Sequence, residues 1–270
     1  RPIWFSMLIY PNAKINIGLN IISRRNDGFH NIESCFCPIS FQDIIEIKPS
    51  NYTSLTTSGI KIPGNINDNL ILKTIRKFKP NTNYKIHLHK IIPIGSGLGG
   101  GSSDASFLLN YLNNKKMSKK ELINFSKKIG SDCPFFIENK NKYVFGTGEE
   151  MKDINIDLND KKIVIIIPEK SISTIEAYNN IRPKKPKFKL KEILENEPLE
   201  KWKNFIKNDF ETYAFSKIKE LKNIKNHINR LGAQFVSMTG SGSAIYGIFN
   251  NNSSIKDNKK YNLIISKVIS

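Results

Sequence analysis

A glycine-dense stretch, Gly95 to Gly101, most restricts what this chain can fold into. It holds five of the chain's 16 glycines, and Ser102 and Ser103 follow it. Glycine density of this kind lets backbone N–H groups turn inward around a concave space, with no Cβ to keep an anion away. The apolar pattern from Ala105 to Leu112 suits a helix, whose positive dipole end would face the same space. We therefore predict a phosphate-binding loop before a helix, and with it a nucleotide-dependent enzyme.

Two other glycine motifs compete with this interpretation. A P-loop requires a lysine directly after its last glycine, and no lysine follows Gly99, Gly100 or Gly101. The spacing Gly95, Gly97, Gly100 matches the dinucleotide fingerprint, but no acidic residue ends a second strand about twenty positions further on. A nicotinamide-dependent enzyme is therefore disfavoured.

The order of apolar patterns predicts an α+β protein with two domains. The chain has 270 residues, which suits one large or two modest domains. The polar segment Asp153–Lys162 separates two hydrophobic regions, so we place the domains at 1–155 and 156–270. Strands are mixed with helices, and few clean strand–helix–strand alternations occur, which favours α+β.

Periodicity predicts the elements of both halves. Alternation from Ile15 to Ile21 predicts a half-buried strand within the strand-rich region 3–48, and the capping box Ser118–Glu121 predicts the start of a helix that Gly130 ends. Further strands are predicted at 44–47, 84–89, 142–145, 162–168, 235–238, 244–249 and 261–268. Further helices are predicted at 70–79, 174–180, 190–196, 201–215 and 218–231.

The net charge bears on which partners the chain binds, and the cysteine content bears on its cellular location. The net charge is +18, but only six of the basic residues are arginine and the lysines are scattered, which indicates a solvated surface and no nucleic-acid site. A basic nucleic-acid-binding protein remains the alternative of a different class.

The aliphatic block Ile163–Ile167 is too short to cross a membrane, and we see no signal peptide. Three cysteines, Cys35, Cys37 and Cys133, form no disulfide framework, so we expect a reducing, cytoplasmic location.

Three ordered segments carry a family resemblance. They are Pro11–Leu19, Pro93–Ser103 and Met238–Ala244. Together they resemble the galactokinase–homoserine kinase–mevalonate kinase (GHMP kinase) superfamily, over nearly the whole chain. The resemblance implies a two-domain GHMP-kinase-like fold, with an N-terminal ribosomal-protein-S5-like domain for ATP and catalysis and a C-terminal ferredoxin-like domain.

A finer resemblance concerns the substrate. The segments Arg24–His30, Asp68–Leu70 and Gly130–Phe136 are similar to those of the superfamily branch that phosphorylates the 2-hydroxyl of a cytidine-diphosphate-linked methylerythritol. That reaction uses ATP and belongs to the non-mevalonate route to isoprenoid precursors. The resemblance thus implies a small-molecule substrate, with no nucleic acid or membrane as partner, and a monomer or homodimer. Another superfamily kinase, for homoserine or mevalonate, remains the alternative.

Catalytic roles follow from the resemblance for two residues. Asp132 lies just past a predicted helix end, in a Gly-Ser-Asp-x-Pro turn, where it would otherwise be a turn-capping residue. The resemblance implies that Asp132 is the general base, paired with Lys14. In a lysine-rich chain Lys14 would otherwise be a solvated side chain, but the resemblance gives it the task of stabilising charge during transfer.

The resemblance also assigns the binding residues. ATP is expected at Pro93, Ile94, Gly95, Ser96, Gly97, Leu98, Gly99, Gly100, Gly101, Ser102 and Ser103. The substrate is expected at Asn16, Phe29, His30, Thr174, Tyr178, Gly240, Ser241 and Gly242, with the cytosine between Phe29 and Tyr178 and its edges read by His30. Mg²⁺ is expected with the nucleotide and held mainly by phosphates and water; its protein ligands are unknown, with Ser103 the candidate.

Overall fold

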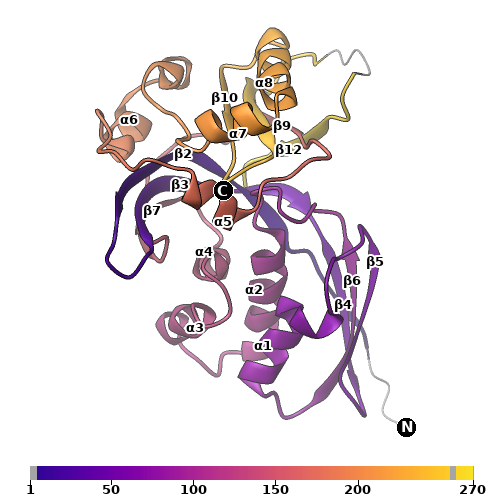
Figure 1. Cartoon of the computed structure of the whole chain (residues 1–270). Coiled ribbons are helices and arrows are strands. Elements are labelled where there is room, and N and C mark those ends of the chain that lie inside the picture. The colour runs from indigo at the N-terminus through magenta and orange to yellow at the C-terminus, as the bar shows by residue number, and fades with distance from the viewer. Residues whose placement is uncertain (1–4, 256–259, 270) are drawn as a thin grey trace. The chain divides into compact units, whose positions relative to one another are not determined.

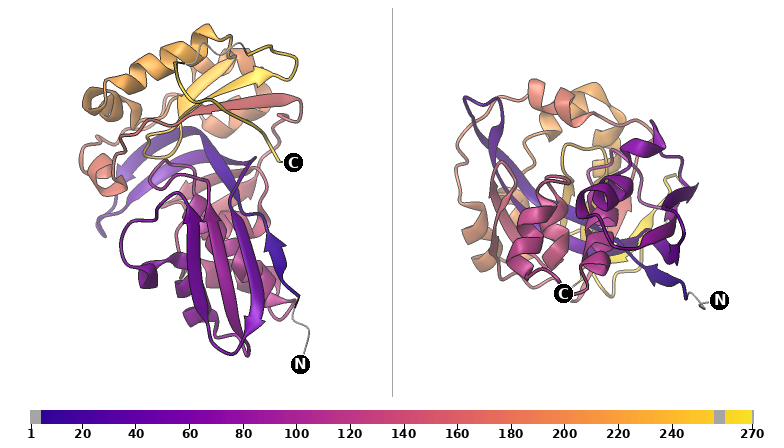
Figure 2. Two further views of the ribbon diagram at one scale, coloured as in Figure 1. Left: turned by 90° about the vertical axis from the view of Figure 1, so that its right-hand side faces the viewer. Right: turned by 90° about the horizontal axis from the view of Figure 1, so that it is seen from below.

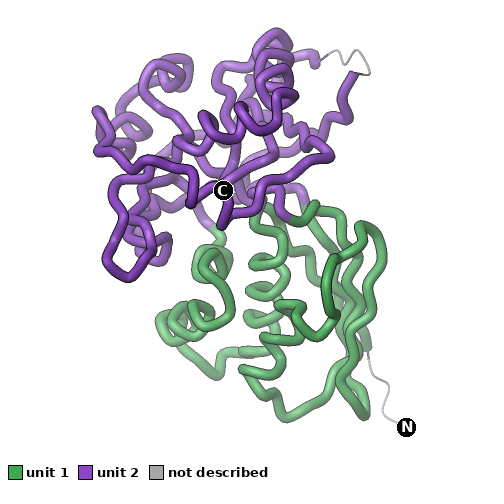
Figure 3. The backbone as a smooth tube through the Cα atoms, viewed as in Figure 1, with its two compact units in different colours: residues 1–13, 42–94, 99–139 green, residues 14–41, 95–98, 140–270 purple. Residues whose placement is uncertain are grey.

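The computed structural model describes residues 5–255 and 260–269, and its elements form two compact units (Figures 1 and 3). Each unit is discontinuous in sequence: unit 1 comprises 1–13, 42–94 and 99–139, and unit 2 comprises 14–41, 95–98 and 140–270. The boundary at residue 155 stays a prediction. The expected strand start at Ile3 lies outside the described residues.

Unit 1 is a sheet covered on one face by helices (Figures 1 and 2). Across the sheet the strands are β1 (Met7–Ile9), β4 (Ile44–Ser50), β6 (Asn83–Lys90) and β5 (Ser54–Gly59). The helices are η1 (Ile66–Asp68), α1 (Leu70–Phe78), α2 (Gly100–Asn113), α3 (Lys119–Ser126) and α4 (Cys133–Glu138). Alternate residues of β4 and β6, such as Ile45 and Leu88, are buried in one core with Ile71 of α1 and Leu108 of α2. This packing holds the start of α2 beside the end of β6.

Among the residues that the structure describes, unit 2 contains two sheets and five helical segments. One sheet has the order β2 (Asn12–Arg24), β3 (His30–Gln42), β7 (Lys142–Gly146) and β8 (Glu150–Asp153). The other has the order β10 (Phe235–Met238), β11 (Ile245–Asn250), β9 (Lys161–Ile166) and β12 (Ile264–Lys267). The helical segments are α5 (Thr174–Asn179), α6 (Leu190–Asn196), η2 (Leu199–Asn204), α7 (Glu211–Lys217) and α8 (Glu220–Arg230).

The second sheet of unit 2 confirms the predicted ferredoxin-like arrangement. The strand pairs β10–β11, β11–β9 and β9–β12 are all antiparallel, and β9, the first of these strands in the chain, lies between the third and the fourth. Helix α8 packs its buried Leu221, Ile224 and Ile228 into a core that includes Val236 and Phe249 of the sheet. The described residues between β11 and β12 form no helix, so α7 and α8 provide the helical cover of this sheet. Within the described part of the chain, no helix is long and apolar enough to cross a membrane.

One predicted helix, over residues 201–215, is wrong. The structure ends η2 at Asn204 and starts α7 at Glu211, because the chain between them bonds to other parts of unit 2. Leu19 N donates to Lys207 O at 2.9 Å, and Asp209 N donates to Leu19 O at 2.8 Å. Backbone groups committed to β2 cannot serve a continuous helix, so tertiary pairing overrides local propensity here.

One further prediction differs from the structure, and one helix is absent from the predictions. The first part of β2, Asn12–Leu19, is buried on both faces and not on one, because polar Lys14 and Asn16 are enclosed together with the aliphatic residues between them. Asp132 lies in a turn, as predicted, and this turn leads directly into α4, for which Asp132 is the N-cap residue. The sequence analysis does not predict α4. Proline at the start of α4 favours a helix there, since its fixed φ suits the first turn.

Candidate active site

The β2 residues Lys14 and Asn16 form a buried polar pair in unit 2. Lys14 Nζ donates to Asn16 Oδ1 at 2.6 Å and lies 4.5 Å from the centroid of the Phe36 ring. Asn16 Nδ2 donates to Ser34 Oγ at 3.0 Å, and Asn16 O accepts from Tyr246 Oη at 2.8 Å. Lys14 is therefore not a solvated lysine: its side chain is 3% exposed and its ammonium group is held at a fixed place.

Thr239 joins this pair to the glycine loop. Its Oγ1 lies 3.1 Å from Asn16 Oδ1 and 3.1 Å from Gly97 O, and it accepts from Asn16 N at 3.0 Å. A Cβ on Gly97, whose φ is +80°, would lie 2.1 Å from Thr239 O, so only glycine fits there. Lys14 N also donates to Leu98 O at 2.9 Å. Three segments distant in sequence, near residues 14, 97 and 239, thus meet within unit 2.

The second glycine turn is tied to the same unit. Ala244 N donates to Ser96 O at 3.1 Å, and Asn208 Nδ2 donates to both Met238 O and Gly240 O at 2.8 Å. Ser241 Oγ lies 3.1 Å from Thr174 Oγ1 at the start of α5. Gly240 and Gly242 have φ of +57° and +98°. The structure therefore brings together Thr174, Gly240 and Ser241, three of the predicted substrate residues.

In unit 1, the C-terminal half of the loop becomes the first turn of α2. Gly99 is the N-cap residue with φ +74°, and Gly100 and Gly101 open the helix. A Cβ on Gly100 would lie 2.9 Å from Lys90 Nζ, so the helix starts directly over that lysine. The first N–H groups of an α-helix have no acceptor within the helix, so those at the start of α2 can donate to a phosphate oxygen.

Beneath α2, Lys90 is enclosed between two buried carboxylates. Its Nζ donates to Asp43 Oδ2 and, at 2.8 Å, to Asp104 Oδ2 on α2. Asp43 Oδ1 also accepts from the backbone N–H groups of Ile91 and Ile92. Burial raises the pKa of Asp104 to about 7; Lys90 opposes this shift, and Asp43 adds to it. Two carboxylates share one ammonium group, so Asp104 binds a proton near neutral pH.

Asp132 lies close to the start of α2 through its neighbours. Cys133 Sγ donates to Ser102 O at 3.6 Å, and a Cβ on Gly130 would lie 3.5 Å from Ser102 Oγ. Burial raises the pKa of the Cys133 thiol to about 11, which keeps it protonated and supports a packing role. The Oγ of Ser103 is buried and has no hydrogen-bond partner among the described residues. The end of the glycine loop and the Asp132 segment therefore share one part of unit 1.

A second group of predicted residues is aromatic and more exposed. His30 stacks on Tyr178 in unit 2, with ring centroids 5.0 Å apart and an interplanar angle of 30°. Phe210 contacts the Tyr178 ring edge-on at 4.9 Å. Burial and, secondarily, Arg24 lower the pKa of His30, so its ring is neutral at pH 7. Phe29 is 64% exposed on the turn before β3, and the structure does not bring it against Tyr178 by any contact that it describes.

Sequence reasoning missed several of these polar residues. The sequence analysis includes Thr239 only as a member of the segment Met238–Ala244, and it predicts a helix over 201–215 that would contain Asn208. The structure gives both residues hydrogen bonds to the glycine turns. Asp43 and Asp104 are not predicted either. The family resemblance matches Lys90 only weakly to a position near the nucleotide, and a lysine in a lysine-rich chain gives no sign of burial. The signal that could have found Lys90 is the alternation of β6, which places it on the same face as apolar Ile86 and Leu88.

Comparison with family models places the chain in a known class. The model for the N-terminal domain of GHMP kinases matches residues 69–140, and the model for their C-terminal domain matches residues 190–259. A curated relative from Azobacteroides pseudotrichonymphae, 4-diphosphocytidyl-2-C-methyl-D-erythritol kinase, is 44% identical over 250 residues, which is 90% of this chain and 93% of the relative. The chain belongs to the GHMP kinase family.

Solved structures agree with this membership. A crystal structure of 4-(cytidine 5'-diphospho)-2C-methyl-D-erythritol kinase matches with a TM-score of 0.74 and 29% identity, covering 90% of each chain. The mevalonate kinase of Methanococcus jannaschii matches with a TM-score of 0.71 over the whole of both chains, but at 16% identity that likeness shows the fold alone.

Proposed function

We propose that this chain transfers the γ-phosphate of ATP to the 2-hydroxyl of 4-diphosphocytidyl-2-C-methyl-D-erythritol. The observation that carries the proposal is the junction at Thr239, where the Lys14–Asn16 pair, the glycine loop and the second glycine turn meet. These are the three segments that resemble the GHMP kinases. The names of the curated relatives and of the 29%-identical structure support the particular acceptor.

The first turn of α2 and the loop before it are the proposed nucleotide site. Its N–H groups hold phosphate oxygens, while Lys90 fixes the helix start from below. Buried Ser103 Oγ, with no partner among the described residues, fits a role as ligand to Mg²⁺. The described residues contain no group of three or more His, Cys, Asp or Glu side chains that could hold a metal, so the nucleotide's phosphates supply most of the ligands. The ion would neutralise charge on the transferred group.

Each catalytic residue has a separate proposed task. Asp132 accepts the proton of the 2-hydroxyl as its oxygen attacks the γ-phosphorus. Lys14, oriented by Asn16 and Phe36, compensates negative charge that develops on the phosphoryl oxygens. Asn16, Thr174, Gly240, Ser241 and Gly242 bind the acceptor, and the Ser241–Thr174 contact supports their common role.

The cytidine end is assigned to Phe29, His30 and Tyr178. Tyr178 already has His30 against one face, so a cytosine on Tyr178 must either displace His30 or use the opposite face. Neutral His30 offers one donor and one acceptor to the base edge. Exposed Phe29 stacks from the turn.

The test is ADP release with four alcohols under the same conditions: the cytidine-linked methylerythritol, homoserine, mevalonate and galactose. We expect kcat/KM for the first to exceed the others by about 10³-fold or more, since the others lack the base and diphosphate. Preferential turnover of homoserine or mevalonate would replace the proposed acceptor but keep the kinase class. If none of the four alcohols causes ATP consumption, the acceptor assignment is refuted as a whole.

A further inference from the structure

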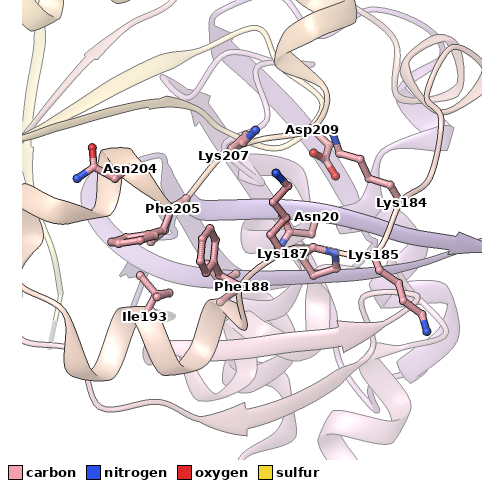
Figure 4. A pocket seen from close by; sticks show the side chains of 13 residues that line it. Asn20, Lys184, Lys185, Lys187, Phe188, Ile193, Asn204, Phe205, Lys207 and Asp209 are labelled. Atoms are coloured by element: carbon pink, nitrogen blue, oxygen red, sulfur yellow. The ribbon is translucent and has the colours of Figure 1, made fainter.

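Unit 2 holds a cavity of about 370 Å³ that the proposed kinase reaction does not use (Figure 4). It lies between β2, the segment before α6, and the segment after η2. Its lining residues are Asn20, Lys184, Lys185, Pro186, Lys187, Phe188, Leu190, Ile193, Asn204, Phe205, Ile206, Lys207 and Asp209. The volume is sufficient for a small organic molecule.

One part of the lining is apolar and built from two rings. Phe188 and Phe205 meet edge-on with centroids 5.0 Å apart, and Ile193 of α6 lies below them in Figure 4. Phe188 is 46% exposed, which is unusual for a large ring already packed against another. The ring pair therefore offers an apolar surface to an occupant of the cavity.

The other part of the lining is cationic, and its lysines differ from their neighbours. Lys189, Lys191 and Lys201 each form an ion pair with a glutamate of the same segment. The lysines that line the cavity have no ion pair within the described ranges 5–255 and 260–269; they are Lys184, Lys185, Lys187 and Lys207. Glu192 and Glu195 of α6 and Glu197 directly after it thus pair with lysines that do not line the cavity.

The single carboxylate of the lining, Asp209, offsets only part of the charge of the four lysines. Asp209 Oδ2 accepts from Ile21 N at 2.9 Å, which fixes the carboxylate against β2. Figure 4 shows the ammonium groups of Lys187 and Lys207 and the Asp209 carboxylate on the same side of the ring pair. Like charges around a concave surface focus a positive potential, which attracts an anion.

We propose that this cavity binds a small organic phosphate with an apolar body, the phosphate at the lysines and the body against Phe188 and Phe205. Charge complementarity selects the anionic head, and the ring pair selects against inorganic phosphate alone. Leu190 and Ile206 of the lining also occupy the space beside Gly18, two residues after Asn16. An occupant would therefore stiffen the strand that carries Lys14 and Asn16.

The probe is 1-naphthyl phosphate, titrated against the full chain by isothermal calorimetry. A non-hydrolysable ATP analogue and the cytidine-linked substrate are both present at saturation, so that the kinase site is blocked. We expect the probe to bind at least about tenfold more tightly than 1-naphthol or inorganic phosphate, since each lacks one half of the interaction. Failure of the proposed kinase function would leave this result unaffected, because the cavity shares no residue with the proposed catalytic set.

Two double variants test the lysines at equal change in net charge. Lys187→Gln with Lys207→Gln should weaken probe binding about tenfold, whereas Lys203→Gln with Lys222→Gln, both exposed and outside the cavity, should change it less than twofold. Phe188→Ala should weaken it about fivefold. The proposal is overturned by absence of binding at 10 mM probe, by equal weakening in both double variants, or by loss of binding when the kinase site is blocked.

Discussion

The polar network under α2 and the aromatic cluster around His30 are built in opposite ways. In the first, Asp43, Lys90 and Asp104 are each less than 4% exposed and bond one another. In the second, Phe29 is mostly exposed, and His30 meets Tyr178 through a ring stack. The first depends on burial of charge, which is costly unless every partner is present. The second depends on ring surfaces that water can still reach.

This difference implies that the buried network serves folding, whereas the aromatic cluster serves substrate recognition. A change in the buried network should alter the stability of unit 1 and, through it, the proposed nucleotide site, because an unpaired buried charge destabilises the folded state strongly. A change at Phe29 should alter affinity for the cytidine-linked substrate and leave folding intact, because an exposed side chain contributes little to the core. The five predictions below test this separation, beginning with the largest expected effect.

Asp132→Asn should reduce kcat by about 10²–10⁴-fold, the usual contribution of a general base. Asparagine keeps the size of the side chain but cannot accept the proton. Rapid-quench single turnover measures the chemical step, and equilibrium titration should give an ATP Kd within about twofold of the parent protein's. Asp160→Asn, at an exposed loop position, is the control and should retain full turnover. Near-normal single turnover in Asp132→Asn would rule out the base assignment.

Lys90→Met should lower the free energy of unfolding by about 3–5 kcal/mol, because it leaves Asp43 and Asp104 buried without their cation. Lys85→Met, at an exposed position of the same strand, is the matched control and should change it by less than about 0.5 kcal/mol. Urea unfolding followed by circular dichroism measures both. Equal stability of the two variants would show that the buried network does not hold unit 1 together.

Asp104→Asn extends the same test if Lys90→Met fails to fold. The pKa of Asp104 is raised from 3.8 to about 7, so ionisation of this carboxyl is less favourable in the folded state than in the unfolded state. Its contribution to stability is therefore complete below pH 4 and declines as the pH rises towards 7. The variant lacks this decline, so its stability relative to the parent protein should increase between pH 4 and pH 7. A pH-independent difference would contradict the shift.

Much of the fold was predictable because the relevant signals are local. The capping box at Ser118 is present as predicted, with Glu121 bonded back to the Ser118 N–H. The helix over 190–196 and the strand over 235–238 are confirmed to the residue, since apolar periodicity and turn residues define both. The order of the glycine motifs also indicated the kinase family, which the domain models and relatives confirm.

The rest depended on contacts between distant residues. No local pattern shows that Leu19 takes the backbone groups of residues 207–209 and so interrupts a helix. Nor does sequence show that Thr239 lies 3.1 Å from Gly97 O, or that Lys90 lies under α2 while most lysines are solvated. The family motif selected Asn16 and Gly97, but not the hydroxyl that links them.

Phe29→Ala should raise the KM for the cytidine-linked substrate about 5- to 150-fold, because stacking on a base contributes about 1–3 kcal/mol. The KM for ATP and the free energy of unfolding should stay within error of the parent values, since the ring is exposed. Tyr52→Ala, at a ring 60% exposed in unit 1, is the control and should alter neither KM. Loss of stability in Phe29→Ala, or an unchanged substrate KM, would break the separation between folding and recognition.

Protonation of His30 should have the smallest effect, and its sign follows from the lowered pKa. Burial and Arg24 keep the ring neutral in the folded protein until the pH falls below the usual value of 6.5. Protonation then removes the ring's acceptor and weakens its contact with the base, so the substrate KM should rise about three- to fivefold between pH 7 and pH 5. His30→Gln, which cannot titrate, should give a flat KM over this range at a level above the parent value at pH 7. A parallel rise in both proteins would assign the titration to the substrate or to another residue, and would remove His30 from the base-reading role.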